Sequence, residues 1–305
     1  MKSFPVWLWS GYGLLIAMFA TMLAIAPFNY GAITSIWYFP AIGMLAAIIA
    51  NTSGTGGGVV FVPVFNILRE SGVYPLSPLQ VTAASFLIQC FGMSVGALRW
   101  THRMKTQQDA GSDSQSVSVN ARDYWTVICV VLIISLPAML ITQHVHQFES
   151  NDILIGFKSF SLLLGSLLIL SAWTVNRNVP EQTALQRLDI MVLMLFAGFG
   201  GFLMALFSVG VGEFVALYLF IRHYPILLST GTACVISAIS ALFGAIWHID
   251  NDTVPWEVVA LAVPGAILGA LLARPLALWL GSLRLKTMDG LWILASSLYL
   301  ILLNI

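Results

Sequence analysis

The chain has 305 residues, of which 59% are hydrophobic and only 9% are charged, and its formal net charge at pH 7 is zero. A soluble domain carries about 25% charged residues, so this composition excludes an ordinary soluble protein. A chain without net positive charge also lacks a basic face that could neutralise phosphates, which argues against a nucleic-acid partner. Several apolar segments reach about 20 residues, the length that crosses a bilayer core. The composition therefore predicts a polytopic membrane protein.

The first apolar segment, 4–28, follows Lys2 and is longer than the apolar core of a signal peptide, which has roughly 7–15 residues. We interpret residues 1–30 as a retained N-terminal transmembrane helix. The three cysteines lie inside apolar segments and are interpreted as small buried side chains. Since no CxxC or HExxH spacing occurs, we expect no metal and no cofactor.

A glycine cluster interrupts the second apolar segment, where a membrane helix would otherwise continue. One arm covers roughly 34–50, the break is SGTGGG at 53–58, and the second arm covers roughly 59–68. Irregular backbone at membrane depth is tolerated only where it packs in protein or lines a wet cavity. A similar break, SVGVGE at 208–213, comes later in the chain and is followed by an arm at 214–221. Two such breaks in corresponding places indicate a transporter's substrate site.

The remaining apolar runs are long enough to predict plain membrane spans. These spans cover roughly 79–98, 124–141, 153–175, 190–207, 227–247, 254–273 and 285–303.

Basic residues gather at one set of span ends. Only Arg69 and Lys158, of the 13 Lys and Arg residues, fall elsewhere. The loops at the opposite ends carry no Lys or Arg, and their acidic residues are Glu149, Asp152, Asp250 and Asp252. Because basic loops stay in the cytoplasm, we predict a multi-pass protein of the bacterial inner membrane with a cytoplasmic N-terminus and a periplasmic C-terminus.

In this orientation the first broken segment enters from the periplasmic side and the second from the cytoplasmic side. Matches at constant offsets support a repeat: Ser53, Gly57 and Phe65 with Ser208, Gly212 and Phe220, and Thr82 and Gly96 with Thr230 and Gly244. The predicted fold is an all-α polytopic membrane protein with one extra N-terminal span. Two inverted-topology repeats, 31–176 and 177–305, would each begin with a broken re-entrant helical hairpin.

The two breaks offer anion-binding chemistry. At a helix start four N–H groups lack an intrahelical partner, and the macrodipole adds about half a positive charge. Two facing helix starts would therefore attract an anion without a fixed Lys or Arg. The predicted substrate-binding residues are Ser53, Gly54, Thr55, Gly56, Gly57, Gly58, Thr82, Ser85, Gln89, Ser208, Gly210, Gly212, Thr230 and Thr232. The competing interpretation is that these small residues only let helices pack closely.

Glu213 is the one carboxylate well inside the apolar region. A carboxylate at that depth is costly and indicates function by default. Protonation would remove the cost, and the carboxyl would then carry a proton together with an anion. The alternative is that Glu213 only caps the helix that begins there.

Short motifs in both halves resemble the TauE/SafE sulfite exporter family. They are GTGGG at 54–58 with Pro63 after it, VTAAS at 81–85, STGTA at 229–233, and Pro264-Gly265 with Gly269. The resemblance implies export or uptake of sulfite, sulfoacetate and other organosulfonates, driven by an ion gradient, with the glycine motifs at the substrate site. The chain departs from the pattern in its second half, where Val209, Glu213 and Tyr218 replace Gly54, Gly58 and Pro63.

We therefore expect a secondary transporter of small sulfur-containing anions that works by alternating access and is not an enzyme. Its expected partners are the anion, the lipid bilayer and a coupling proton or sodium ion. The sequence does not decide whether the protein forms a homo-oligomer. No paired carboxylates or Ser/His/Asp set lies within the spans, which argues against a membrane enzyme. The alternatives are a transporter of another small anion or of a cation, and a non-transporting membrane subunit.

Overall fold

The computed structural model describes residues 5–28, 30–70, 72, 74–109, 119–145 and 181–302, together with isolated positions between 156 and 173. Every regular element within these residues is a helix, which confirms the predicted all-α class. Six of the described helices are long and apolar enough to cross a membrane. Lys158 and most of the predicted span at 153–175 lie outside the described residues.

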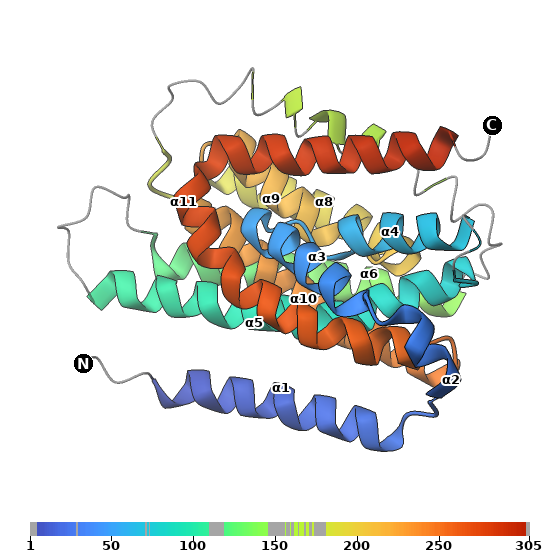
Figure 1. Cartoon of the computed structure of the whole chain (residues 1–305). Coiled ribbons are helices and arrows are strands. Elements are labelled where there is room, and N and C mark those ends of the chain that lie inside the picture. Colours follow the sequence, from blue (N-terminus) through green and yellow to red (C-terminus); the bar gives the residue numbers. More distant parts are fainter. Residues whose placement is uncertain are drawn as a thin grey trace.

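The helices follow one another along the chain as Figure 1 labels them. They are α1 (Val6–Ile25), α2 (Tyr30–Ile33), the 3-10 turn η1 (Thr34–Ile36), α3 (Phe39–Ser53), α4 (Gly58–Glu70), α5 (Pro78–Asp109), α6 (Ala121–Val145), α8 (Arg187–Phe207), α9 (Val211–Ile221), α10 (Ile226–Asp250) and α11 (Trp256–Leu302).

The last two predicted spans form one helix, α11, instead of two. The residues between these spans, 274–284, include four Leu, one Ala and two Arg, which favour a helix, and a single glycine, so the helix continues through them. Pro264 and Pro275 lie inside α11, and the ribbon changes direction sharply along its course (Figure 1). Proline is the usual cause of such a kink because it removes one helix hydrogen bond. The prediction of two separate helices here was wrong.

Helices α5 and α10 pack against each other and form the centre of the bundle. In their most apolar windows 83% and 78% of the residues are buried, compared with 11% for α1. Around this centre α3 packs on α11 and α6 packs on α8, whereas α1 lies at the periphery (Figure 1). The long helices that come after the two broken segments, α5 and α10, therefore form the middle of the molecule.

Glycines bring α3 and α11 into backbone contact. A Cβ atom added at Gly265 would lie 1.8 Å from the carbonyl oxygen of Pro40, and one at Gly269 would lie 2.2 Å from that of Met44. Gly43 of α3 makes the reciprocal approach to the carbonyl oxygen of Ala262, at 2.2 Å. These glycines serve close helix packing, as small residues commonly do in membranes.

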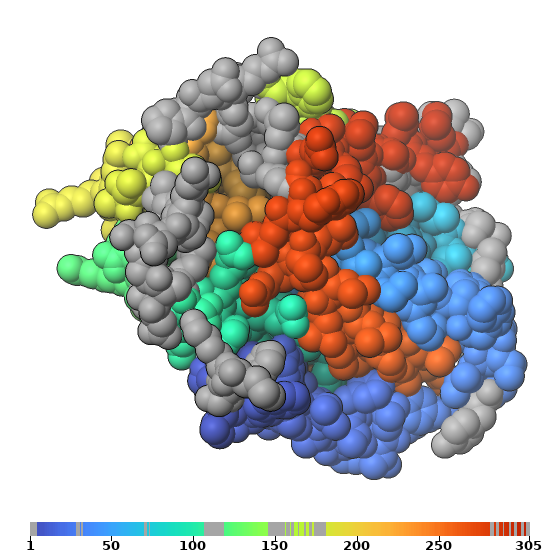
Figure 2. Space-filling model, turned by 60° about the vertical axis from the view of Figure 1, so that its left-hand side comes forward, coloured from blue at the N-terminus to red at the C-terminus, as the bar shows by residue number. Residues whose placement is uncertain are grey.

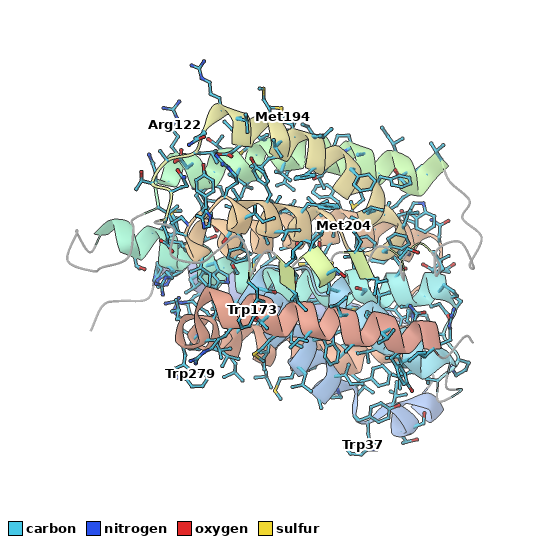
Figure 3. All side chains as sticks on the ribbon, turned by 90° about the horizontal axis from the view of Figure 1, so that it is seen from above. Trp37, Arg122, Trp173, Met194, Met204 and Trp279 are labelled. Atoms are coloured by element: carbon cyan, nitrogen blue, oxygen red, sulfur yellow. The ribbon has the colours of Figure 1, made fainter. Side chains whose placement is uncertain are left out.

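The outer surface suits a lipid environment. Large apolar side chains such as Ile133 and Leu195 are more than 70% exposed on the described surface. Exposed tryptophans stand at both ends of the bundle: Trp37 at one end, and Trp279 at the other, where Arg122 also lies (Figure 3). Aromatic side chains favour the two interfaces of a bilayer, so the long axis of the bundle runs along the membrane normal.

Candidate functional site

The first predicted break is present between α3 and α4. Helix α3 ends at Ser53, and Gly54 adopts a left-handed conformation with φ of 79° while its N–H donates to the carbonyl oxygen of Ala50 at 3.0 Å. Residues 54–57 are not helical, and α4 begins at Gly58. Glycine adopts the left-handed conformation without steric cost, so this residue ends α3.

The second predicted break is present between α8 and α9. Helix α8 ends at Phe207, Ser208 has φ of 56°, and Gly210 has φ of 145°. Ser208 is one of three described residues other than glycine with positive φ. Such a conformation is uncommon for a residue with a side chain and tends to occur at functional positions.

The two breaks meet inside the bundle. A Cβ atom added at Gly58 would lie 2.1 Å from the carbonyl oxygen of Ser208, so the two hairpins touch through their backbones. Gly54 approaches the backbone of α10 in the same way, with its added Cβ 2.8 Å from Cα of Thr230. The structure thus brings the sequence-predicted glycines of both halves to one place.

Gln89 of α5 links its own helix to the second break. Its Nε2 donates to the Oγ of Ser208 at 2.7 Å, to the carbonyl oxygen of Ser208 at 3.0 Å and to the Oγ of Ser85 at 3.1 Å. Gln89 is 1% exposed. An interior amide with these partners fixes the position of the Ser208 backbone.

Thr82 and Thr230 make matching contacts with opposite hairpins. The hydroxyl of Thr230 on α10 donates to the carbonyl oxygen of Ser53 at 3.2 Å, and that of Thr82 on α5 donates to the carbonyl oxygen of Leu206 at 3.3 Å. Both carbonyls belong to the last turn of a helix, where intrahelical donors are missing. Each threonine therefore stabilises the end of the first arm in the other half.

Glu213 caps α9 and keeps one oxygen free. Its Oε2 accepts the N–H of Gly210 at 2.7 Å, which confirms the capping role. Its Oε1 faces the backbone of Gly56 but makes no hydrogen bond of good geometry with the described residues, although the side chain is 1% exposed. Because an unsatisfied buried carboxylate oxygen is costly, capping alone does not explain this residue.

Three buried atoms without partners converge beside Gly56. A Cβ atom added at Gly56 would lie 2.9 Å from Oε1 of Glu213, 3.0 Å from Oε1 of Gln89 and 3.5 Å from Oγ of Ser237. Among the residues that the structure describes, none offers a hydrogen bond to any of these three atoms. A side chain at position 56 would push the Glu213 and Gln89 oxygens away from this point, which glycine leaves open.

Ser237 is a site residue that the sequence interpretation missed. It lies on α10, seven residues after Thr230, which is about two helical turns. It also lies 148 residues after Gln89, the same offset that separates Thr230 from Thr82. That shared offset was the signal that could have found it.

The start of α4 supplies the donors. Within the described residues, no hydrogen bond uses the N–H of Gly57 or of Gly58, while the next three N–H groups bond back to Gly56 and Gly57. Unpaired N–H groups at a helix start carry partial positive charge. The site therefore combines amide donors with the oxygens of Glu213, Gln89 and Ser237. In the part of the chain that the structure describes, no group of three or more metal-ligating side chains occurs.

Three predicted hydroxyls, those of Thr232, Ser53 and Thr55, have partners nearby in the sequence. The Oγ1 of Thr232 donates within its own helix to the carbonyl oxygen of Leu228 at 2.6 Å, so it does not contact the breaks through a hydrogen bond. Ser53 and Thr55 share a hydrogen bond of 2.7 Å across the first break. Every predicted side-chain donor in the site is at most 3% exposed, so the site is closed to solvent in this conformation.

Asp189 holds the base of the second hairpin. Its fully buried carboxylate accepts hydrogen bonds from Oη of Tyr218 at 2.7 Å, from Nε of Arg222 at 2.8 Å and from Oη of Tyr224. The backbone N–H of Gln186 donates to it at 3.2 Å. These bonds join the beginning of α8 to the end of α9.

A comparison with protein families identifies the chain. Residues 39–300 match the family model described as Sulfite exporter TauE/SafE. The chain belongs to the TauE/SafE sulfite exporter family. The TauE/SafE match begins at the first residue of α3 and contains both breaks, whereas α1 precedes it. No curated protein and no solved structure matches the chain. The family assignment confirms the predicted resemblance and makes the protein a membrane transporter of the sulfite exporter type.

Proposed function

We propose that the protein is a secondary transporter of small sulfur-containing anions, sulfite or organosulfonates such as sulfoacetate, in the bacterial inner membrane. The observation that carries the proposal is the meeting of two helix breaks around free amide donors at Gly57 and Gly58. A sulfite or sulfonate group presents oxygens that accept such N–H bonds, and the helix dipole favours its charge. No buried Lys or Arg is needed for this recognition.

Glu213 is the proposed proton carrier. Its free Oε1 and the free Oε1 of Gln89 lie within 3.0 Å of the same point beside Gly56, and both are acceptors. A proton on Glu213 would convert one acceptor into a donor and remove a negative charge that repels the anion. Anion and proton would then enter together, which couples transport to the proton gradient.

Sodium is the second candidate for the coupling ion. The three free oxygens of Glu213, Gln89 and Ser237 are of the kind that alkali and alkaline-earth cations accept as ligands. A sodium ion there would neutralise Glu213 as a proton does. Stimulation of transport by sodium at constant pH would favour this alternative.

Matching contacts in the two halves support alternating access by inverted repeats. The pairs Gly57–Gly212 and Gln89–Ser237 occupy corresponding positions, at offsets of 155 and 148 residues. A Cβ at Gly57 would lie 2.8 Å from Cγ of Gln89, and one at Gly212 would lie 2.0 Å from Oγ of Ser237. Each hairpin thus rests on the same position of the span that follows it. Rocking the two halves would expose the closed site to each side in turn.

The thermal stability of the purified protein, measured against a panel of anions, tests this proposal. The panel contains sulfite, sulfate, thiosulfate, taurine, sulfoacetate, acetate and chloride at several pH values. A ligand at 100 times its Kd should stabilise the protein by about 2.7 kcal/mol. We expect stabilisation by sulfite or a sulfonate and none by acetate or chloride.

Gly57→Leu supplies the matched negative variant, because an added Cβ there already clashes with Gln89 and with the ring of Phe61. Gly13→Leu is the control, since a Cβ at Gly13 meets nothing within 4 Å. Loss of the anion response in both variants, or in neither, would contradict the assignment of the site.

A further inference from the structure

A cleft of about 600 Å³ lies between α1, α5 and α11, on the side of the bundle away from the two breaks. Its walls are apolar and include Leu15 and Ile16 of α1 and Ile267 and Leu271 of α11. At one end the walls carry Arg99 and His102 of α5 and Arg274 of α11. Figure 2 shows α1 along the lower edge of the molecule, below α11. The cleft therefore combines an apolar body with a cationic end.

The arginines at this end are incompletely hydrogen-bonded within the described residues. The Nε atoms of Arg99 and of its neighbour Arg103 are buried and have no hydrogen-bond partner in this part of the structure. Arg274 donates through Nη1 to the carbonyl oxygen of Arg99 at 3.3 Å and is repelled by the charges of Arg99 and Arg103. Partly buried guanidinium groups with unsatisfied N–H groups are costly and would be stabilised by an anion.

The depth of these arginines corresponds to a lipid head group. Arg99 lies about 32 Å along α5 from its first residue, and Arg274 lies about 27 Å along α11 from its first residue. Since a bilayer core is about 30 Å thick, both guanidinium groups reach an interface. Trp9 and Tyr12, which also line the cleft, are side chains that prefer that level.

Helix α1 is held against the bundle at this end, and further along it also packs on α5, where the ring of Phe19 lies 5.6 Å from that of Phe91. The ring of Trp7 lies 6.2 Å from that of His102, and Nζ of Lys105 lies 4.4 Å from the Trp7 ring centroid. Most of α1 remains exposed. An acyl chain can therefore enter from the bilayer beside α1 while the head group stays at the arginines.

We propose that this cleft binds an anionic phospholipid, with its phosphate on Arg99 and Arg274 and one acyl chain between α1 and α11. Charge complementarity selects an anionic head group, and the apolar walls select a lipid over a free ion. The site does not depend on the proposed transport function, because it shares no residue with the two breaks. It uses α1, which precedes the region matched by the family.

The test measures lipid bound to the purified full-length protein by mass spectrometry of the intact complex. The protein is reconstituted in nanodiscs of phosphatidylcholine with increasing phosphatidylglycerol, and its thermal stability is recorded in parallel. We expect selective retention of phosphatidylglycerol and a higher Tm in its presence. In Arg99→Gln/Arg274→Gln the affinity should fall roughly tenfold or more, because two charge-assisted hydrogen bonds are lost.

Two matched controls make the result decisive. Arg122→Gln/Arg187→Gln removes the same charge from exposed positions and should retain the lipid. Leu271→Trp fills the cleft and should expel the lipid, whereas Leu272→Trp, on the exposed face, should not. If lysine at position 274 binds the lipid where glutamine does not, the loss in the double variant reflects the lost charge and not misfolding.

Equal retention of phosphatidylcholine and phosphatidylglycerol by the unmodified protein would overturn the proposal. So would loss of the lipid in the exposed-charge control, or a Tm increase that inorganic phosphate alone reproduces.

Discussion

Glu213 has two roles in one side chain, because one oxygen caps α9 and the other faces the site. Glu213→Gln keeps an acceptor for the N–H of Gly210 but cannot lose or gain a proton. We expect the variant to fold normally and to transport at a rate that no longer changes with pH, as measured by anion uptake into proteoliposomes at a series of pH values. Glu257→Gln, at the start of α11, is the control and should keep the pH profile. A variant at position 213 with the original pH profile would leave Glu213 as a cap only.

The hydroxyl of Ser237 has no partner among the described residues and lies beside Gly56, so its removal tests the site. Ser237→Ala removes one hydrogen-bonding group from the site, which is worth about 0.5–1.5 kcal/mol. We expect the apparent KM for the transported anion to rise roughly two- to tenfold with little change in Tm. Ser240→Ala is the matched control, because Ser240 is on the same helix, equally buried and also unpartnered, but is not among the atoms nearest to Gly56. An equal effect of the two substitutions would count against a site at Gly56.

Residue type revealed some of these positions and concealed others. Glycine clusters and a deep carboxylate are rare in membrane spans, so Gly54, Gly56, Gly57 and Glu213 stood out from the sequence. A single serine on a helix has no such local signature, because its hydroxyl usually bonds to its own backbone. Ser237 therefore emerged only when the structure placed it beside Gly56.

At the level of elements, the second hairpin depends on the carboxylate of Asp189, which joins the start of α8 to the end of α9. Asp189→Asn keeps the shape but removes the charge that Arg222 pairs with. We expect a loss of about 1.5–3 kcal/mol in the free energy of unfolding, seen as a lower Tm, because hydrogen bonds to a charged group are the strong ones. Asp250→Asn, at an exposed helix end, should leave the Tm unchanged. An unchanged Tm in the position 189 variant would show that the hairpin is held by packing alone.

Helix ends that coincide with glycine runs could be predicted from the sequence. The course of α11 could not, because no glycine run separates its two parts. Both helix breaks occur where the glycine runs placed them. The continuous α11 was missed because a charged stretch was interpreted as a loop, although its Leu and Ala residues favour a helix and its prolines only bend it. The role of Asp189 could not be predicted from the sequence, since its partners come from α9 and from the turn after it.

At the scale of the molecule, the composition and the spans predicted the membrane class, and the family match agrees with it. The closed state of the site could not be predicted, because burial depends on how the two halves pack around it. The hydrogen bonds of Thr82 to Leu206 and of Thr230 to Ser53 each join a residue of one half of the chain to a residue of the other half. Transport would require these contacts to loosen on one side at a time.

Uptake of sulfite and sulfoacetate by proteoliposomes under an imposed proton gradient tests the central claim most directly. The account predicts uptake that the gradient drives, that unlabelled substrate inhibits, and that is lost in Gly57→Leu but retained in Gly13→Leu. No uptake of any sulfur-containing anion by folded protein, with and without a gradient, would contradict it.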